Sequence, residues 1–505
     1  MEAHTYFFIV SKYWSRKIVF VIVGITAFFS LGLPAAFSSS STTKYLAFQV
    51  FIGAFDPTVP IGGSGINPLS PPPPKAAISE FVQDIIDRIG VKGNEQTKLA
   101  FIEGPFCFDH SDSDISRVVR EAFEIALEKD IAVGFHIDDS MFWARRIDLW
   151  RDPNNIEWLD WDGTVNTGRK IDWGQPEKLA PQMCFNSKAI QAEVRRRATD
   201  VIGKAIKEGI DKLRQEGKEE LFAGAIVGWE TQIGRDFDSN KFLGYCALTN
   251  RGFNKNNPPQ DLDAEREKAV QEFIELWAKG IFDAGINPDK IYAHTAFLSK
   301  KIFDIAKPDQ NYSEINSFAP PSVAFGKYHN PGFSTYHQSG LMEQVYEELA
   351  AHNNPHWASS EGTNLQLGYG PGGSGMNMET YLAKMFNHGA ILVNIFAWGI
   401  GGEAEKVKNN PFRIATEGKE AIGAYQKFLK GEELVEQISA PPFSMEQLAA
   451  KVQKVQKEAP VWVHKTGNQA KVESLLQKLD QYIKEQNFRE AERMADEILE
   501  LIGSK

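Results

Sequence analysis

Short apolar runs alternate with longer amphipathic stretches through most of the chain. Each run is rich in small and branched apolar residues and ends in polar or aromatic ones, as in "FAGAIVGWE" at 222–230. In the stretches between the runs, apolar residues recur every three or four positions, which is the spacing of one helix face. The pattern predicts eight strands, at 45–51, 98–104, 131–138, 222–230, 290–297, 333–337, 357–362 and 390–398, with 322–326 as a competing position for the sixth.

Strands separated by helices pair in parallel through right-handed crossovers. Eight such units predict an α/β fold, a TIM (β/α)8 barrel with long loops, over residues 44–435. An open doubly wound sheet is the alternative. It is disfavoured because the first strand is not followed by a compact Gly-rich turn that opens a helix.

The two ends of the chain differ from this central part. Residues 18–37 are an uncharged, mostly apolar run behind a basic flank, and a Ser/Thr linker follows. Residues 1–43 are therefore expected to be a signal peptide or an uncleaved membrane anchor, which implies a secreted, periplasmic or membrane-anchored protein. Residues 440–505 are charged and helical, and predict a C-terminal helical hairpin with a turn near Asn487. The hairpin would pack on the barrel or mediate self-association.

Composition narrows the possible functions. The chain has 505 residues and a net charge of −11, which argues against nucleic acid as a partner. Its three cysteines have neither the spacing of a zinc site nor that of a disulfide framework. The Gly-rich segment 368–375 lacks the Lys-Ser/Thr of a phosphate-binding loop. No cofactor is expected.

Two glutamates stand at the ends of predicted strands. Glu230 ends the fourth run and Glu361 lies in the seventh. In a parallel barrel the chemistry lies at the carboxyl ends of the strands, so these two carboxylates can face one pocket. Two carboxylates on opposite sides of a glycosidic bond are the groups that its hydrolysis requires. Glu230 and Glu361 are therefore the predicted catalytic residues.

Other strand ends carry side chains suited to binding sugar. Aromatic rings stack on the apolar face of a sugar, and polar side chains bind its hydroxyl groups. The loop after the third strand is long and contains several tryptophans, which either bind substrate or form a small core that holds the loop together. The predicted substrate-binding residues are His136, Asp138, Trp143, Trp229, His294, Tyr336 and Trp398.

A metal site in "HIDD", formed by His136, Asp138 and Asp139, is a further possibility. Neighbouring residues of a strand point to opposite faces, so the three side chains are not expected to converge. We therefore expect no metal.

The placement of these residues resembles that of the (β/α)8 glycoside hydrolases called clan A. That resemblance implies that Glu230 is the acid/base and Glu361 the nucleophile of a retaining mechanism. It also implies that Tyr336 lies beside the nucleophile and that Trp398 lies under the sugar. One departure is Trp229, because clan members usually have Asn immediately before the acid/base.

The sequence thus predicts an exported glycoside hydrolase that cleaves oligo- or polysaccharide. Barrels of the β-amylase type place glutamates at the same two strands but act by inversion, so an inverting glycosidase remains an alternative. A non-catalytic glycan-binding barrel is the second alternative. The carbohydrate is the expected partner, and the oligomeric state is not indicated.

Overall fold

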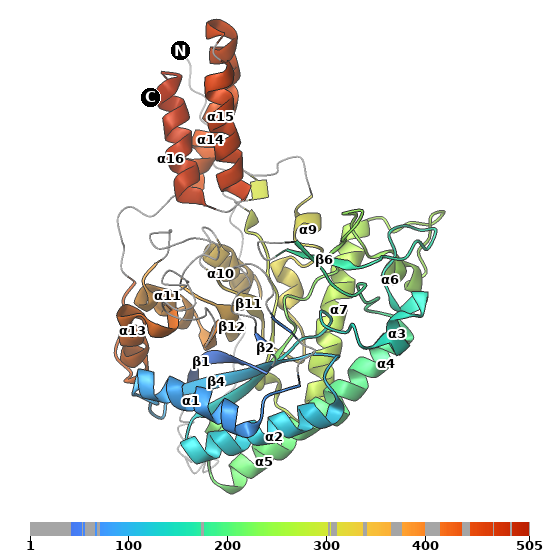
Figure 1. The fold of residues 1–505 in the computed structure, drawn as a ribbon, viewed down its shortest axis with the longest axis vertical. Coiled ribbons are helices and arrows are strands. Elements are labelled where there is room, and N and C mark those ends of the chain that lie inside the picture. The colour runs from blue at the N-terminus through green and yellow to red at the C-terminus, as the bar shows by residue number, and fades with distance from the viewer. Residues whose placement is uncertain are drawn as a thin grey trace, which may run out of the picture. The chain divides into compact units, whose positions relative to one another are not determined.

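Eight parallel strands form a closed barrel in the computed structural model of the chain (Figure 1). Their order around the sheet is β10-β8-β5-β4-β1-β13-β12-β11. The first and last strands of this order are joined by hydrogen bonds from Ala293 N to Asn330 O (3.0 Å) and from Thr295 N to Gly332 O (3.1 Å). The strands are β1 (Lys44–Phe51), β4 (Thr97–Phe106), β5 (Ala132–Ile137), β8 (Phe222–Val227), β10 (Ile291–Ala293), β11 (Gly332–Ser334), β12 (Trp357–Gly362) and β13 (Ala390–Ile395).

The predicted TIM barrel is confirmed, and each of the eight predicted runs overlaps one of its strands. The competing position for the sixth strand is instead the 3-10 helix η5 (Pro321–Ala324). Proline at the start of this segment fixes φ near the helical value and removes a backbone donor that a sheet would need, so a helical turn is favoured there.

The structure describes residues 42–52, 54–55, 66–67, 71–172, 176–300, 303–304, 311–336, 341–364, 376–398, 415–436, 445–467, 469–484 and 487–503. The predicted signal peptide or anchor over 18–37 lies outside these residues. Within them, no helix is both long and apolar enough to span a membrane.

Helices cover the outside of the barrel (Figure 1). Helix α2 (Asp112–Lys129) is capped by Ser111, whose Oγ accepts a hydrogen bond from Asp114 N (3.1 Å). The longer helices are α1 (Lys75–Ile89), α2 (Asp112–Lys129), α4 (Lys188–Arg196), the π-helical η2 (Arg197–Gly203), α5 (Lys204–Gln215), α7 (Leu262–Asp283), α10 (Leu341–Ala351), α11 (Met378–Phe386) and α13 (Lys419–Leu429). Shorter elements are α3 (Ile147–Trp150), η1 (Pro153–Asn155), η3 (Glu219–Leu221), α6 (Tyr245–Asn250), η4 (Pro288–Lys290) and α9 (Tyr312–Ile315).

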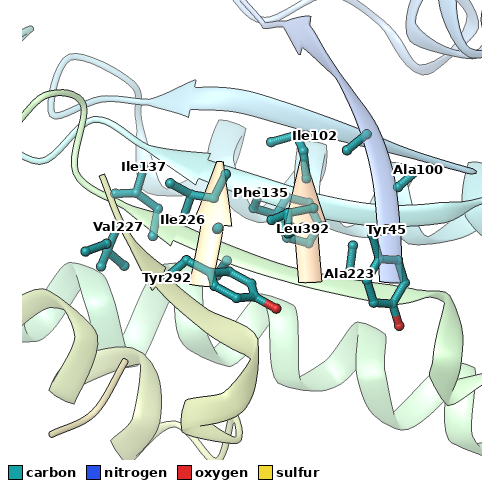
Figure 2. Packing of buried hydrophobic residues seen from close by; sticks show 14 of the residues in the cluster. Tyr45, Ala100, Ile102, Phe135, Ile137, Ala223, Ile226, Val227, Tyr292 and Leu392 are labelled. Atoms are coloured by element: carbon teal, nitrogen blue, oxygen red, sulfur yellow. The ribbon is translucent and has the colours of Figure 1, made fainter. Parts of the chain in front are cut away.

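Side chains of each barrel strand alternate between the helices outside and the barrel interior. On β1, Phe48 points outward and meets Tyr425 of α13, with the ring centroids 5.0 Å apart. The next residue, Gln49, points inward and is fully buried. Figure 2 shows part of the apolar packing, in which Phe135, Ile226, Tyr292 and Leu392 come from four different strands. A polar residue on the inward face, such as Gln49, needs hydrogen-bond partners from other strands.

The loop after β5 folds back onto the barrel. It contributes β6 (Arg169–Asp172) and β7 (Pro176–Lys178) to a small antiparallel sheet with β9 (Arg235–Asp236), which follows β8. The two-residue strands β2 (Ala54–Phe55) and β3 (Ile66–Asn67) pair in a second small sheet. Glu157 fastens the same loop to α6, because its Oε2 accepts hydrogen bonds from Cys246 N (3.1 Å) and Ala247 N (3.4 Å).

Glu157→Gln should abolish a pH-dependent loss of stability. Burial raises the pKa of Glu157 to about 7, so the folded chain holds a proton there that an unfolded glutamate releases at about pH 4.3. The stabilisation is present below the unfolded pKa and is lost as pH rises through 7. Between pH 5 and 8 the wild type should lose roughly 2–3 kcal/mol from this group, and the variant should not.

Urea unfolding at the two pH values measures this difference. Glu95→Gln, at an exposed position, is the control and should leave the pH dependence of the wild type unchanged. Equal pH dependence in wild type and Glu157→Gln would contradict the assignment.

The C-terminal region has a hydrophobic core of its own. The predicted hairpin corresponds to α15 (Gln469–Lys484) and α16 (Phe488–Leu501), and Asn487 caps α16 where the turn was expected. A third helix, α14 (Met445–Thr466), packs with them through buried residues such as Leu448 and Val455. The region is therefore a three-helix unit.

Candidate active site

The two predicted catalytic glutamates lie at the same end of the barrel. Glu361 is on β12 and is 4% exposed, whereas Glu230 follows β8 in a sharp turn and is partly exposed. The turn requires Gly228, which has a φ of 105° and whose added Cβ would lie 2.5 Å from Thr231 Oγ1. Glu230 itself has a φ of 54°, an uncommon conformation for a residue with a side chain. Strained backbone of this kind concentrates at functional sites.

Ser334 on β11 links the two glutamates. It is paired in register with Glu361, and its Oγ donates a hydrogen bond to Glu230 Oε1 (2.9 Å). The negative charge of Glu230 also acts on Glu361, where it raises the pKa. The structure thus brings the carboxylates of strands β8 and β12 together, as the sequence predicted.

Tyr336 forms a hydrogen bond with only one of the two carboxylate oxygens of Glu361. Its hydroxyl donates to Glu361 Oε1 at 2.5 Å, and Glu361 Oε2 has no hydrogen-bond partner among the described residues. Burial, and then the charge of Glu230, raise the pKa of Glu361 well above its ordinary value, although the Tyr336 hydrogen bond opposes this shift. This raised pKa favours the protonated form of Glu361 while Glu230 is ionised. One protonated and one ionised carboxyl are the starting state for two-carboxylate hydrolysis.

A chain of hydrogen bonds runs from Glu230 into the barrel. Ser334 Oγ lies 2.8 Å from His294 Nε2, and His294 Nδ1 lies 3.0 Å from His136 Nε2. His136 Nδ1 lies 3.0 Å from Gln49 Oε1, and Asn394 Nδ2 donates a hydrogen bond to the same oxygen (2.9 Å). Burial lowers the pKa of His136 to about 3 and that of His294 well below its ordinary value, so both rings are neutral.

Gln49, Ser334 and Asn394 were not predicted from the sequence. Gln49 and Asn394 lie within the apolar runs "YLAFQVF" and "AILVNIF", where a polar residue is unusual. A buried polar side chain inside such a run needs a hydrogen-bond partner, so these two positions were the available indication of a polar layer in the barrel.

Ser334→Ala should reduce kcat/KM by roughly 10- to 100-fold, because it removes a hydrogen bond to a charged carboxylate. The ionised form of Glu230 would lose stabilisation, so the limb of the pH–rate profile that reports Glu230 should move to higher pH. Ser360→Ala is a matched control. Ser360 is equally buried, but its hydroxyl donates to the backbone oxygen of Ala293 (2.6 Å). An unshifted pH profile in Ser334→Ala would show that Ser334 does not position Glu230.

Aromatic rings surround the glutamates. Trp229 stacks on His136, with ring centroids 4.6 Å apart and planes inclined by 13°. Phe51, at the end of β1, and Phe396, after β13, both lie beside Trp229, at 6.1 Å and 6.4 Å. Phe396 also lies 6.3 Å from Tyr336. The rings of Trp229, Phe51, Phe396 and Tyr336 therefore form one aromatic group next to the glutamates. Phe51 and Phe396 are its partly exposed members.

Trp398, expected under the sugar, lies elsewhere. Its Nε1 donates to Asp84 Oδ2 (2.8 Å) on α1, and its ring packs edge-on against Phe48, which points out of the barrel. The residue at the end of strand β13 that faces Tyr336 is Phe396, two positions earlier. Sequence placed the aromatic residue on the correct strand but not at the correct position, because the chain leaves the strand at Ile395.

Asp138 and Trp143, also predicted to bind substrate, are used within the protein. Asp138 accepts hydrogen bonds from the backbone amides of Ser140, Met141 and Phe142, and is fully buried. Trp143 is also fully buried, and its Nε1 donates to Pro181 O (2.9 Å). For these residues the alternative of a small core within the loop describes the structure. Trp173 of the same loop lies outside the described residues.

Among the described residues, one group of potential metal ligands includes a catalytic candidate, Glu361. A ligand atom from each of His136, His294 and Glu361 lies within 4.8 Å of the other two. The grouping of His136 with Asp138 and Asp139, which was disfavoured from the sequence, is not found among the described residues, and Asp139 accepts a hydrogen bond from Thr231 Oγ1 (2.6 Å). Both nitrogens of His136 and both of His294 already take part in the hydrogen-bond chain, so a metal would have to displace part of it.

Fold and site together define a (β/α)8 barrel with two adjacent glutamates at the carboxyl ends of strands β8 and β12. No protein-family model matches the sequence, and no curated protein matches it. Among solved structures, the chain is similar to the catalytic domain of a beta-amylase from Paenibacillus polymyxa. That similarity has 9% identity and a TM-score of 0.45, and it covers 78% of this chain and 99% of the other.

Two further similarities extend the comparison. A GH5 (subfamily 4) endo-beta-1,4-glucanase from Bacillus licheniformis is 12% identical with a TM-score of 0.34, over 76% of this chain and 60% of that one. A D-psicose 3-epimerase is 11% identical with a TM-score of 0.31, over 77% and 100% of the two chains. Such similarities concern the barrel, and the side chains of the site must indicate the chemistry.

Proposed function

We propose that the protein is a glycoside hydrolase in which Glu361 and Glu230 cleave the glycosidic bond of an oligo- or polysaccharide. One observation carries the proposal: Ser334, which is paired in register with Glu361, donates a hydrogen bond to Glu230, and Glu361 Oε2 has no hydrogen-bond partner among the described residues. The neighbouring aromatic rings supply stacking surfaces for a sugar.

The proposed route is a retaining double displacement. In the reactive state Glu230 carries the proton. Glu361 is ionised, and its charge is stabilised by the Tyr336 hydroxyl. The free oxygen of Glu361 attacks the anomeric carbon, while Glu230 protonates the leaving oxygen and the glycosidic bond breaks. Water then attacks the glycosyl–enzyme ester with Glu230 as base, which releases Glu361 and the sugar. The partly exposed Glu230 is suited to meet both the leaving group and the water.

A panel of nitrophenyl glycosides, with the anomer of the first product followed by NMR, tests the proposal. Retention of configuration supports the double displacement, and inversion supports the alternative in which Glu361 activates water. Saccharide binding without hydrolysis across the panel would favour the non-catalytic glycan-binding alternative.

Export of the protein is a separate proposal, supported by the apolar run at 18–37 behind a basic flank. We also propose that the chain is divided into an N-terminal targeting segment (1–43), a catalytic barrel (44–435) and a helical region (440–505). Cell fractionation with an antibody to the barrel tests export, and the mass of the mature chain distinguishes a cleaved signal peptide from a retained anchor.

A further inference from the structure

A buried cation near Glu230 has no hydrogen-bond partner for its side chain within the described part of the chain. Arg169 begins β6 and is 2% exposed. Its Nε, Nη1 and Nη2 atoms are all enclosed, and none has a hydrogen-bond partner there. A guanidinium has five N–H donors and stays charged in proteins, so burying it unpaired costs far more than burying a neutral group.

Arg197 shows how this chain satisfies a buried arginine elsewhere. It is also 2% exposed, but its guanidinium donates to Phe108 O (2.9 Å) and His110 O (2.6 Å). Arg169 has no such carbonyl partner among the described residues. The contrast leaves the donors of Arg169 unmatched within the part of the chain that the structure describes.

The guanidinium of Arg169 lies beside the turn that carries Glu230. A Cβ added to Gly234, four residues after Glu230, would lie 3.4 Å from Arg169 Nε. The acidic residues that act on Arg169 electrostatically are Asp139, Asp138 and Glu230. Of these three acidic residues only Glu230 is partly exposed.

These acids have other partners for their oxygens. Asp139 accepts from Thr231 Oγ1 (2.6 Å) and Ser140 Oγ (3.1 Å), and Asp138 accepts from three backbone amides. Glu230 Oε1 accepts from Ser334. They offset the charge of Arg169 at a distance, but its planar fork of donors remains available for a bidentate acceptor.

We propose that Arg169 binds a carboxylate carried by the substrate, so that the sugar unit held next to Glu230 is a uronic acid or another carboxylated sugar. This inference rests on the proposed hydrolase function. A carboxylated sugar would be repelled by the charge of the two glutamates, and a cation beside them removes that penalty. Arginine matches the planar geometry of a carboxylate and can form two parallel hydrogen bonds with it.

The test compares nitrophenyl glucuronides and galacturonides of both anomers with the corresponding glucosides and galactosides. The wild type should prefer the uronides in kcat/KM by roughly 10- to 100-fold, the range of charge-assisted hydrogen bonds. Arg169→Met should abolish the preference mainly through a higher KM for uronides. Arg169→Lys keeps the charge but not the fork, and should retain part of the preference.

Several outcomes would overturn the proposal. A wild type that prefers neutral glycosides, or an Arg169→Met variant that slows neutral and acidic substrates equally, would make Arg169 a structural counter-charge and leave the hydrolase function intact. A preference for sulfated sugars would indicate that Arg169 binds a sulfate ester and not a carboxylate.

Calorimetry keeps the two proposals separable. If no glycoside is cleaved, titration of glucuronate and glucose into the wild type and Arg169→Lys tests the carboxylate site without catalysis. Selective binding of glucuronate that is weakened in the variant would support the site although the hydrolase function failed. Equal binding of both sugars would reject the site, and the Lys variant serves if Arg169→Met does not fold.

Discussion

Glu361→Gln should lower kcat by at least roughly 10⁴-fold, because an amide neither attacks the anomeric carbon nor activates water for that attack. The amide oxygen can still accept the Tyr336 hydrogen bond, so the site should keep its geometry. The fold should not suffer. Burial raises the pKa of Glu361, which means that ionising this residue costs stability at neutral pH. The variant should therefore be at least as stable as the wild type at pH 8.

Glu103→Gln is a matched control for this prediction. Glu103 is also a buried glutamate on a barrel strand, and burial likewise raises its pKa. The charged groups that act on it, Glu121 and Arg117, belong to α2 outside the barrel. Its substitution should leave turnover near that of the wild type. If Glu361→Gln retained more than about a tenth of the wild-type kcat, a loss far smaller than removal of a nucleophile produces, Glu361 would not be the nucleophile.

Glu230→Gln should reduce turnover of natural glycosides by roughly 10²- to 10⁴-fold, the usual contribution of a general acid or base. Nitrophenyl glycosides have a leaving group that departs without a proton, so their first step should be affected much less. The slow step for them becomes attack of water on the glycosyl–enzyme, and a burst of nitrophenol should precede the steady state.

Azide distinguishes the two roles. It needs no general base, so it should restore turnover of nitrophenyl glycosides in Glu230→Ala and yield a glycosyl azide of retained configuration. In Glu361→Ala the azide would instead take the place of the nucleophile and yield the inverted product. The same azide anomer from both variants would contradict the assigned roles.

The barrel could be predicted from sequence because its strands are local runs of apolar residues, and several of them are followed by a clear helix. The two glutamates and Tyr336 could be predicted because they stand where those runs end. The course of the long loop could not, because β6 pairs with β9, which lies beyond the next barrel strand. Arg169 therefore reaches the site through pairing between distant segments, and no local pattern marks it.

The sequence shows how many tryptophans the chain has, but it does not show which of them bind substrate. A tryptophan can fill a core or face a ligand, and composition does not separate the two. Trp229 lies beside the glutamates, whereas Trp143 fills the loop core and Trp398 turns to α1. The buried polar layer was indicated by polar residues inside apolar runs. Which of these residues form hydrogen bonds with each other could not be predicted, because the partners are up to 345 residues apart in the sequence.

The shortest strands of the barrel, β10 and β11, have three residues each and meet where the sheet closes. His294 follows one of them, and Ser334 and Tyr336 lie at and just beyond the end of the other. A seam with so few ladder hydrogen bonds is the part of a sheet that opens at the smallest cost in free energy. On heating, we therefore expect the contacts of Ser334 and Tyr336 with the two glutamates to be lost while most of the barrel is still folded. Activity should then be lost at a lower temperature than the global unfolding transition.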